Sequence, residues 1–290
     1  SVPYETLVKM MDTFRDVFCL DKDCEITLEC NPGTVTKEAL KAYRAAGINR
    51  LSIGLQSTDN ALLKILGRIH TYEQFLETYT WAREAGFENI NVDIMSGLPN
   101  QTLEQYEDTL KKLVELKVEH ISAYSLIVEE GTPFYKLYEG DRLALPDEDI
   151  EREMYYRTKD ILKEAGFERY EISNYAKKGY ECRHNIRYWV RQDYLGLGLG
   201  ASSCIENTRY KNTEWLDEYL LENKYTEKTE VQNLSKEECM EEFMFLGLRM
   251  MEGVNAGEFQ KEFGQSIQQV YGVQIKKLIE QGLLKFSEET

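Results

Sequence analysis

Amphipathic helical stretches alternate with short apolar runs along the first 175 residues of the chain. Three helical stretches end at an Ala-Gly pair that precedes such a run, with the glycines at Gly47, Gly86 and Gly166. Glycine there accepts the positive φ that ends a helix. We predict helices over residues 4–18, 37–46, 60–66, 72–85, 103–116 and 147–165. We predict strands over residues 25–30, 50–55, 90–95, 121–126 and 169–173.

This strand–helix repeat of about 40 residues predicts parallel strands joined by crossover helices. None of the predicted strands leads into the Gly-rich phosphate loop that a doubly wound nucleotide-binding sheet carries. The predicted fold class is therefore α/β, with four or five βα units forming part of a TIM-type barrel.

The pattern changes beyond about residue 230. Residues 236–249, 255–263 and 267–281 predict three short helices, and residues 282–286 predict the start of a strand, an outline similar to a winged helix. Before them, alternating leucines and glycines at residues 195–201 predict a strand whose bare face allows close approach of a ligand or another backbone. Their G-x-G-x-G spacing does not match a dinucleotide fingerprint. We predict three parts: a partial barrel (1–175), a connecting region (176–230) and a truncated helical domain (231–290).

Composition narrows the function. Of the 290 residues 42% are hydrophobic, and 35 Lys+Arg stand against 51 Asp+Glu. The net charge of −16 argues against general binding to nucleic acid, which needs a basic footprint. No apolar run reaches the roughly 18 residues that a membrane-spanning helix needs. The six cysteines form neither a C-x-x-C pair nor a zinc pattern, which predicts reduced thiols in the cytoplasm.

Polar residues stand near the carboxyl ends of four predicted strands, where parallel barrels bind ligands. They are Glu29, Gln56, Asp93 and Ser125, with Arg68 one short helix after the second strand. A carboxylate, an amide and a guanidinium in one pocket suit a small ligand with an amine, hydroxyls and a carboxylate. Ordinary solvated loop residues are the alternative interpretation.

His184 is the most suggestive of the three histidines, the others being His70 and His120. Imidazole is a good iron ligand, and the nearby Tyr188 and Trp189 could flank a flat apolar ring. Cys182 is a second candidate ligand. A structural or surface histidine is the alternative, and His120, at the start of a strand, is predicted to be structural.

Several ordered motifs resemble those of the oxygen-independent coproporphyrinogen oxidase-like radical SAM proteins. They are Leu28-Glu29-Cys30-Asn31-Pro32-Gly33-Thr34, Leu51-Ser52-Ile53-Gly54-Leu55-Gln56-Ser57, Leu66-Gly67-Arg68 and Asn91-Val92-Asp93-Ile94-Met95-Ser96-Gly97-Leu98-Pro99. Glu171-Ile172-Ser173-Asn174-Tyr175-Ala176, followed by His184-Asn185-x-x-Tyr188-Trp189, resembles the HemW branch, whose members are regarded as heme chaperones. The resemblance covers essentially the whole chain.

The resemblance implies a (βα)6 radical SAM barrel, of which strands three to six are visible, and a small C-terminal helical domain. It implies S-adenosylmethionine (SAM) contacts at Glu29, Gln56, Arg68, Asp93 and Ile127, the last through its backbone. It also implies heme at His184, flanked by Tyr188 and Trp189. The family's C-x-x-x-C-x-x-C loop for a [4Fe–4S] cluster is absent, so we expect a fragment whose cluster ligands lie upstream of Ser1 and whose first strand is a sheet edge.

Three functions follow for comparison. The first is a heme-binding chaperone on a radical SAM scaffold. Its expected partners are heme and a heme-accepting protein, and peripheral contact with a membrane is compatible with it. The second is oxygen-independent coproporphyrinogen III oxidase, an enzyme that converts propionates to vinyls by a SAM-derived radical. The third is a TIM-type hydrolase, for which no nucleophile with a nearby histidine is visible. The sequence favours the first and leaves open whether the chain is an enzyme.

Overall fold

The computed structural model describes residues 2–140, 142–221 and 228–287. The chain forms two compact units, Ser1–Glu181 and Cys182–Thr290. The part boundaries predicted after residues 175 and 230 stay a prediction. No helix within the described residues is long and apolar enough to cross a membrane.

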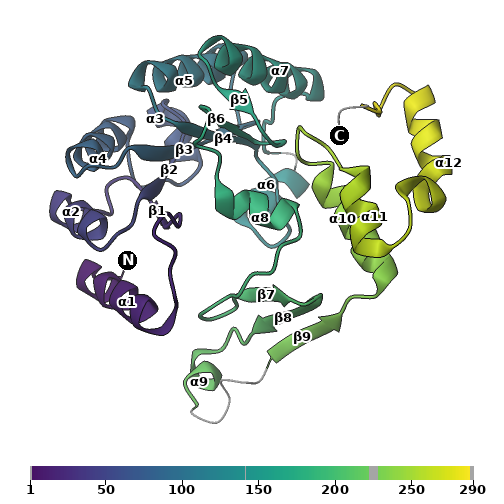
Figure 1. Ribbon diagram of the computed structural model, residues 1–290. Helices are drawn as coiled ribbons and strands as arrows, with labels where there is room; N and C mark the ends of the chain where they lie inside the picture. Colours follow the sequence, from purple (N-terminus) through teal and green to yellow (C-terminus); the bar gives the residue numbers. More distant parts are fainter. Residues whose placement is uncertain (1, 141, 222–227, 288–290) are drawn as a thin grey trace. The chain divides into compact units, whose positions relative to one another are not determined.

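The first unit is built on a six-stranded sheet of order β1-β2-β3-β4-β6-β5 (Figure 1). The strands are β1 (Thr27–Cys30), β2 (Arg50–Gln56), β3 (Asn89–Ser96), β4 (His120–Ser125), β5 (Glu168–Arg169) and β6 (Asn174–Ala176). The first four are mutually parallel, as predicted. Within the described residues the sheet is open and β1 is one of its edges, as expected.

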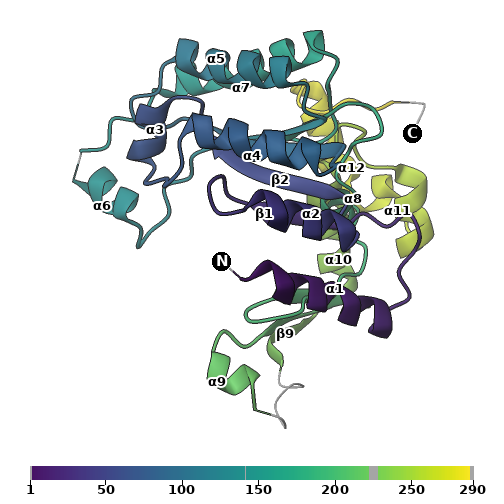
Figure 2. The same ribbon diagram turned by 90° about the vertical axis from the view of Figure 1, so that its left-hand side faces the viewer.

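Seven helices accompany this sheet in the described part of the first unit. They are α1 (Tyr4–Val17), α2 (Lys37–Ala45), α3 (Asn60–Ile65), α4 (Tyr72–Glu84), α5 (Leu103–Leu116), α6 (Pro133–Glu139) and α7 (Glu148–Glu164). All but α6 were predicted within two residues at each end. Figure 1 shows α1, α2, α4, α5 and α7 in an arc along one side of the sheet, and Figure 2 shows α5 and α7 side by side.

Local signals explain where these helices begin and end. Thr71 and Thr102 start α4 and α5 with capping boxes, each pairing with a glutamine three residues later. Gly47, Gly86 and Gly166 follow α2, α4 and α7 with φ of 89°, 90° and 82°, which confirms the predicted helix ends.

The two faces of the sheet differ in chemistry. Strand register places apolar side chains together on one face, in rows such as Leu51 with Ile90 and Ile53 with Val92 and Ile121. These side chains form the main core with the helices. The alternate positions carry Ser52, Asn91, His120 and other polar residues, so the second face is polar.

The predicted fifth parallel strand is wrong. Of residues 169–173, only Arg169 belongs to β5, and the rest form a turn. The chain then returns as β6, which pairs antiparallel with both β4 and β5. The turn is closed by Glu171, whose Oε1 accepts hydrogen bonds from Ser173 N at 2.8 Å and Asn174 Nδ2 at 2.6 Å. This local side-chain bonding competes with a continuous strand.

The second unit contains helix α8 (Arg183–Trp189), an antiparallel sheet and a group of helices. The sheet has the order β7-β8-β9, with β7 (Ser202–Ile205), β8 (Thr208–Asn212) and β9 (Lys228–Asn233). The helices are α9 (Leu216–Tyr219), α10 (Lys236–Gly247), α11 (Ala256–Phe263) and α12 (Ile267–Glu280). The last three confirm the predicted helical tail, and they share a core that includes Phe259 and Ile275.

Two predicted strands in this unit are wrong. Residues 195–201 form a turning loop, because Gly198 and Gly200 adopt φ of 101° and 63°, outside the extended region. The predicted close backbone approach is confirmed at Gly196, where a side chain would collide with the carbonyl oxygen of Ser202. Residues 282–286 are not a strand, since the backbone N–H groups of Leu283 and Leu284 both donate to Leu278 O and close a turn after α12.

Candidate functional site

Asn91 lies at the centre of the polar face of the sheet. Its Nδ2 donates to Ser52 Oγ and to Asp93 Oδ1, each at 2.8 Å. Its Oδ1 lies 2.6 Å from His120 Nδ1 and 3.1 Å from Ser122 Oγ. One buried amide therefore joins side chains from β2, β3 and β4.

His120 is fully buried within this network and extends it. Burial, then the nearby positive charge of Arg50, holds its pKa well below the usual value, so the ring is neutral at neutral pH. Since Asn91 presents its oxygen, Nδ1 of His120 carries the proton, and Nε2 accepts from the Tyr170 hydroxyl at 2.9 Å. His120, which the sequence predicts to be structural, therefore has a structural role in this network.

Asp93 extends the same network toward the carboxyl end of β3. Ser52 Oγ donates to its Oδ2 at 3.0 Å, in addition to the bond from Asn91. Burial raises the pKa of Asp93 and the charge of Glu29 adds to this, while the bonds from Asn91 and Ser52 oppose it. The carboxyl group is thereby oriented before any ligand arrives.

Gln56 is the last residue of β2, and Arg68 lies beyond the carboxyl end of this strand. Gln56 has a φ of 73° and its side chain is buried, with its Oε1 accepting from the Tyr124 hydroxyl at 3.0 Å. Arg68 donates to Asn31 Oδ1 at 3.1 Å. A Cβ at Gly54 would lie 3.1 Å from both Asn31 Oδ1 and Gln56 Nε2, so glycine leaves room for this close arrangement.

Tyr124 connects these groups, and our sequence reasoning missed it. Burial raises its pKa, as do the charges of Asp93 and Glu29, while Gln56 and Arg68 lower it. Four of the five predicted SAM residues, all but Ile127, therefore act on the hydroxyl of Tyr124, and Gln56 is bonded to it directly. The alternation of His120, Ser122 and Tyr124 along β4 was a signal that could have found it.

The remaining predicted residues, Glu29, Ile127 and Ser125, lie in different surroundings. Glu29 is exposed, opposite Ser52 in the register, and with Asn31 it lines a cavity of about 520 Å³ beside β1. Ile127 follows β4 and is 76% exposed, and its predicted backbone contact with the adenine stays a prediction. Ser125 does not join the group, since it alternates with Tyr124 along β4 and pairs with Ser96 Oγ at 3.1 Å.

The donor set of the polar face fits SAM. Carboxylates of Glu29 and Asp93 suit its amine and hydroxyls, and the guanidinium of Arg68 suits its carboxylate. An iron–sulfur cluster has no such fit, because no three His, Cys, Asp or Glu residues in the described ranges gather as a metal site. The six cysteines form no disulfide among themselves, and burial raises the pKa of Cys30 to about 12, which keeps this thiol protonated.

Helix α8 of the second unit presents a different kind of site. His184 is exposed on this helix, and its ring lies 4.9 Å from that of Tyr188, edge to face. The Tyr188 ring in turn lies 4.6 Å from the ring of Tyr194. Trp189 is half-buried beneath the guanidinium of Arg249, 4.2 Å from its ring centroid. The candidate ligand Cys182 is buried, which removes it from the surface where His184 lies.

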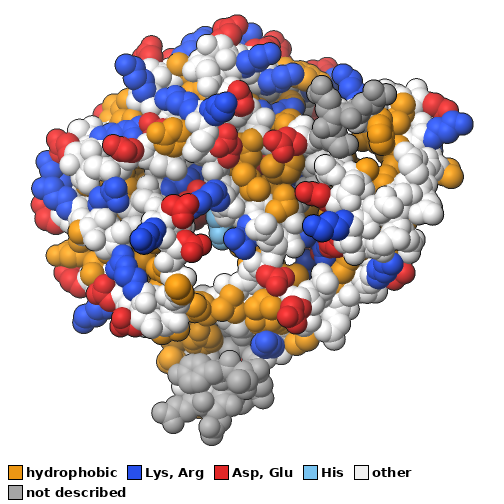
Figure 3. Space-filling view, in the orientation of Figure 1, with side chains coloured by type: hydrophobic (Ala, Val, Ile, Leu, Met, Phe, Trp, Pro, Cys, Tyr) orange, Lys and Arg blue, Asp and Glu red, His pale blue; other side chains and the backbone are white. Residues whose placement is uncertain are grey.

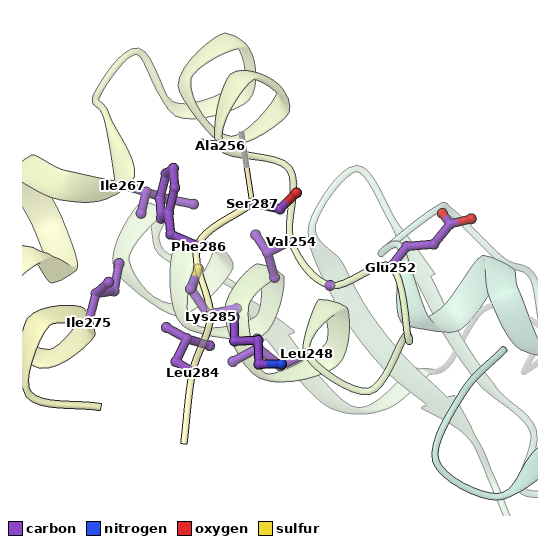
Figure 4. A pocket seen from close by; sticks show the side chains of 12 residues that line it. Leu248, Glu252, Val254, Ala256, Ile267, Ile275, Leu284, Lys285, Phe286 and Ser287 are labelled. Carbon is purple, nitrogen blue, oxygen red and sulfur yellow. The ribbon is translucent and has the colours of Figure 1, made fainter. Parts of the chain in front are cut away.

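A small apolar pocket of about 130 Å³ lies in the helical tail (Figure 4). Figure 4 shows Ile267, Ile275, Leu284 and Phe286 gathered around it, while the carboxylate of Glu252 points away. Its size and apolar walls indicate a packing defect of the core rather than a site for polar chemistry.

Surface charge agrees with the argument from composition. On the face drawn in Figure 3, Lys and Arg side chains are interspersed with Asp and Glu rather than gathered in one basic patch. A nucleic-acid interface would need such a patch.

Known protein families match a part of each of the two units. Residues 4–113 match the family model of the radical SAM superfamily, and residues 234–290 match the HemN C-terminal domain. The chain is similar to heme chaperone HemW of Lactococcus lactis, with 41% identity over 97% of this chain and 74% of the relative. Heme chaperone HemW of Bacillus subtilis is 40% identical over 99% of this chain and 77% of the relative.

A solved structure supports the fold. The coproporphyrinogen III oxidase HemN of Escherichia coli, described as a radical SAM enzyme, matches with a TM-score of 0.83. The match covers 99% of this chain and 70% of HemN at 22% sequence identity. At that identity it shows a shared fold.

Proposed function

The chain belongs to the HemW/HemN-like radical SAM family, and from that premise we propose that it is a heme-binding chaperone on a radical SAM scaffold. The observation that carries this proposal is the exposed imidazole of His184 against the Tyr188 ring on α8. Imidazole binds heme iron, and an aromatic neighbour covers a porphyrin face. Its relatives named heme chaperone HemW support the same function.

In this proposal the polar face of the first unit binds SAM. Glu29, Asp93, Gln56 and Arg68 contact its polar groups, and the backbone of Ile127 contacts the adenine. SAM and a [4Fe–4S] cluster are the cofactors that a radical SAM domain implies. The residues of this chain fit SAM, and the cluster ligands are expected upstream of Ser1.

The oxidase alternative is not adopted. HemN shares the fold at 22% identity, whereas relatives named heme chaperone HemW reach 40% and 41%. The hydrolase alternative likewise finds no support in the family. Delivery of heme to an accepting protein, peripheral membrane contact and a cytoplasmic location remain predictions.

A heme titration followed by Soret absorbance tests the function. We expect saturable binding by the full 290-residue chain, and His184→Ala should weaken it about tenfold or more, since the axial bond is lost. The variant keeps His70 and His120, but both are buried.

The matched control is Cys19→Ser, which removes an exposed thiol that could bind heme adventitiously. Its affinity should equal that of the unmodified chain. Equal affinity of His184→Ala and the unmodified chain would remove His184 as the ligand, and absence of saturable binding would remove the function.

A further inference from the structure

A cavity of about 320 Å³ lies within the second unit beside the last residues of α8 and the segment that follows it. Tyr188, Trp189 and Tyr194 form aromatic parts of its wall, and Arg209 and Glu242 form charged parts. Tyr188 therefore lines the cavity and also contacts the ring of His184. Nothing in the family motifs assigns a role to Arg209.

The two arginines of this cavity differ in how much of their donor capacity is exposed. Arg191 is enclosed, with 6% of its side chain exposed, and donates to Glu262 Oε1 at 2.8 Å and to Asn207 Oδ1 at 2.9 Å. Arg209 pairs with Glu242 Oε1 through Nη2 at 2.9 Å, yet 39% of its side chain is exposed. Arg209 is thus the more accessible of the two arginines, with Glu242 and Tyr194 as its partners, whereas Arg191 is enclosed by its partners.

The position of Arg209 is held on several sides. It lies on β8 opposite Cys204 of β7. Cys204 in turn exchanges two backbone hydrogen bonds with Tyr194, at 2.9 and 3.0 Å. Glu242, with 11% of its side chain exposed, accepts from both arginines and fixes them against α10. The guanidinium is therefore preorganised, which lowers the entropy cost of binding.

We propose that Arg209 anchors a propionate of the bound porphyrin, whose ring lies against Tyr188 and Tyr194. The inference rests on the proposed heme binding at His184 and names the group that orients the ring. A planar guanidinium matches a carboxylate in two parallel hydrogen bonds. A local cation is needed because the chain carries a net charge of −16, which repels a dianionic porphyrin.

The test compares two ligands: heme and iron protoporphyrin IX dimethyl ester, in which both carboxylates are blocked. Arg209→Gln should weaken heme binding about tenfold and leave binding of the dimethyl ester unchanged. Arg209→Lys should recover part of the heme affinity, because it restores charge without the planar fork. The matched control is Arg187→Gln, an exposed arginine of α8, which should bind both ligands like the unmodified chain.

The outcomes separate this inference from the proposed function. Equal weakening of heme and ester by Arg209→Gln would mean a structural role and overturn the inference. Unchanged binding of both would also overturn it, while loss of heme binding in His184→Ala would still support the chaperone. Absence of heme binding in the unmodified chain would overturn both.

Discussion

The polar face of the sheet and the surface of α8 both suit ligands, but they hold their side chains in opposite ways. On the sheet, Asn91 and His120 are buried and bonded to other side chains, so the site is formed before a ligand arrives. On α8, His184 is exposed and Tyr188 is held by ring contacts. Buried polar networks stabilise the fold, whereas exposed groups remain available for binding.

The comparison predicts its largest effect at Asn91. Asn91→Ala removes the amide that bonds Ser52, Asp93 and His120, leaves His120 Nδ1 without its buried acceptor, and should lower the free energy of unfolding by about 3 kcal/mol. Urea denaturation followed by circular dichroism measures this. The control Asn233→Ala, at an exposed position of β9, should change it by less than about 0.5 kcal/mol. Similar values for the two variants would contradict the importance of the network.

His120 should make stability depend on pH. Below pH ~6.5 the unfolded chain binds a proton at this histidine while the folded chain does not, since burial lowers its folded pKa. The contribution is therefore present above pH ~6.5 and is lost as the pH falls, by about 2 kcal/mol at most between pH 6.5 and pH 5.

Urea denaturation at several pH values measures this loss, and His120→Gln should abolish that part of it. His70→Gln is the matched comparison, because burial lowers the pKa of His70 in the same direction. An unchanged slope in His120→Gln would show that His120 binds its proton equally well in the folded and the unfolded chain, contrary to the expected lowering of its pKa.

Tyr124 should have a moderate effect. Tyr124→Phe removes the hydrogen bond to Gln56 and should cost about 1 kcal/mol of unfolding free energy, together with a several-fold weaker affinity for SAM. Equilibrium dialysis with SAM measures the second effect. Tyr138→Phe, at a position 58% exposed on α6, should change neither quantity. Equal SAM binding by both variants would remove Tyr124 from the site.

The smallest expected effect on stability is at His184. His184→Ala should alter the free energy of unfolding by less than about 0.5 kcal/mol, because the side chain is exposed, even though heme affinity falls. Thermal denaturation without heme measures it. A loss above 1 kcal/mol would give His184 a structural role and blur the contrast with the sheet.

Local patterns were sufficient for most elements of the fold. Helix periodicity with a following glycine predicted α2, α4 and α7, and parallel pairing followed from the repeat. The errors arose where backbone geometry or distant partners decide. Gly198 and Gly200 take positive φ, and the chain turns back within residues 169–173, although the sequence pattern of both segments predicts an extended strand.

The residues of the candidate site likewise fall into those that local patterns predicted and those that depend on distant partners. The sequence pointed to Glu29, Gln56, Arg68 and Asp93 as strand-end polar groups and to His184 through its motif. It missed Tyr124, Asn31 and Arg209. The relevance of these three depends on neighbours far along the chain: Tyr124 bonds Gln56, 68 residues away, and Arg68 bonds Asn31, 37 residues away.

The sequence by itself determined the alternation of strands and helices, the family motifs and the spacing of His184 from Tyr188, because these depend on near neighbours. The tertiary structure decided which face of the sheet is polar and that Asn91 joins His120, 29 residues away, with Asp93. It also decided that Ser122 Oγ donates a hydrogen bond of 2.7 Å to Asn174 Oδ1, 52 residues away. Such contacts follow from strand register, which is set by the packing of the whole apolar face on its helices.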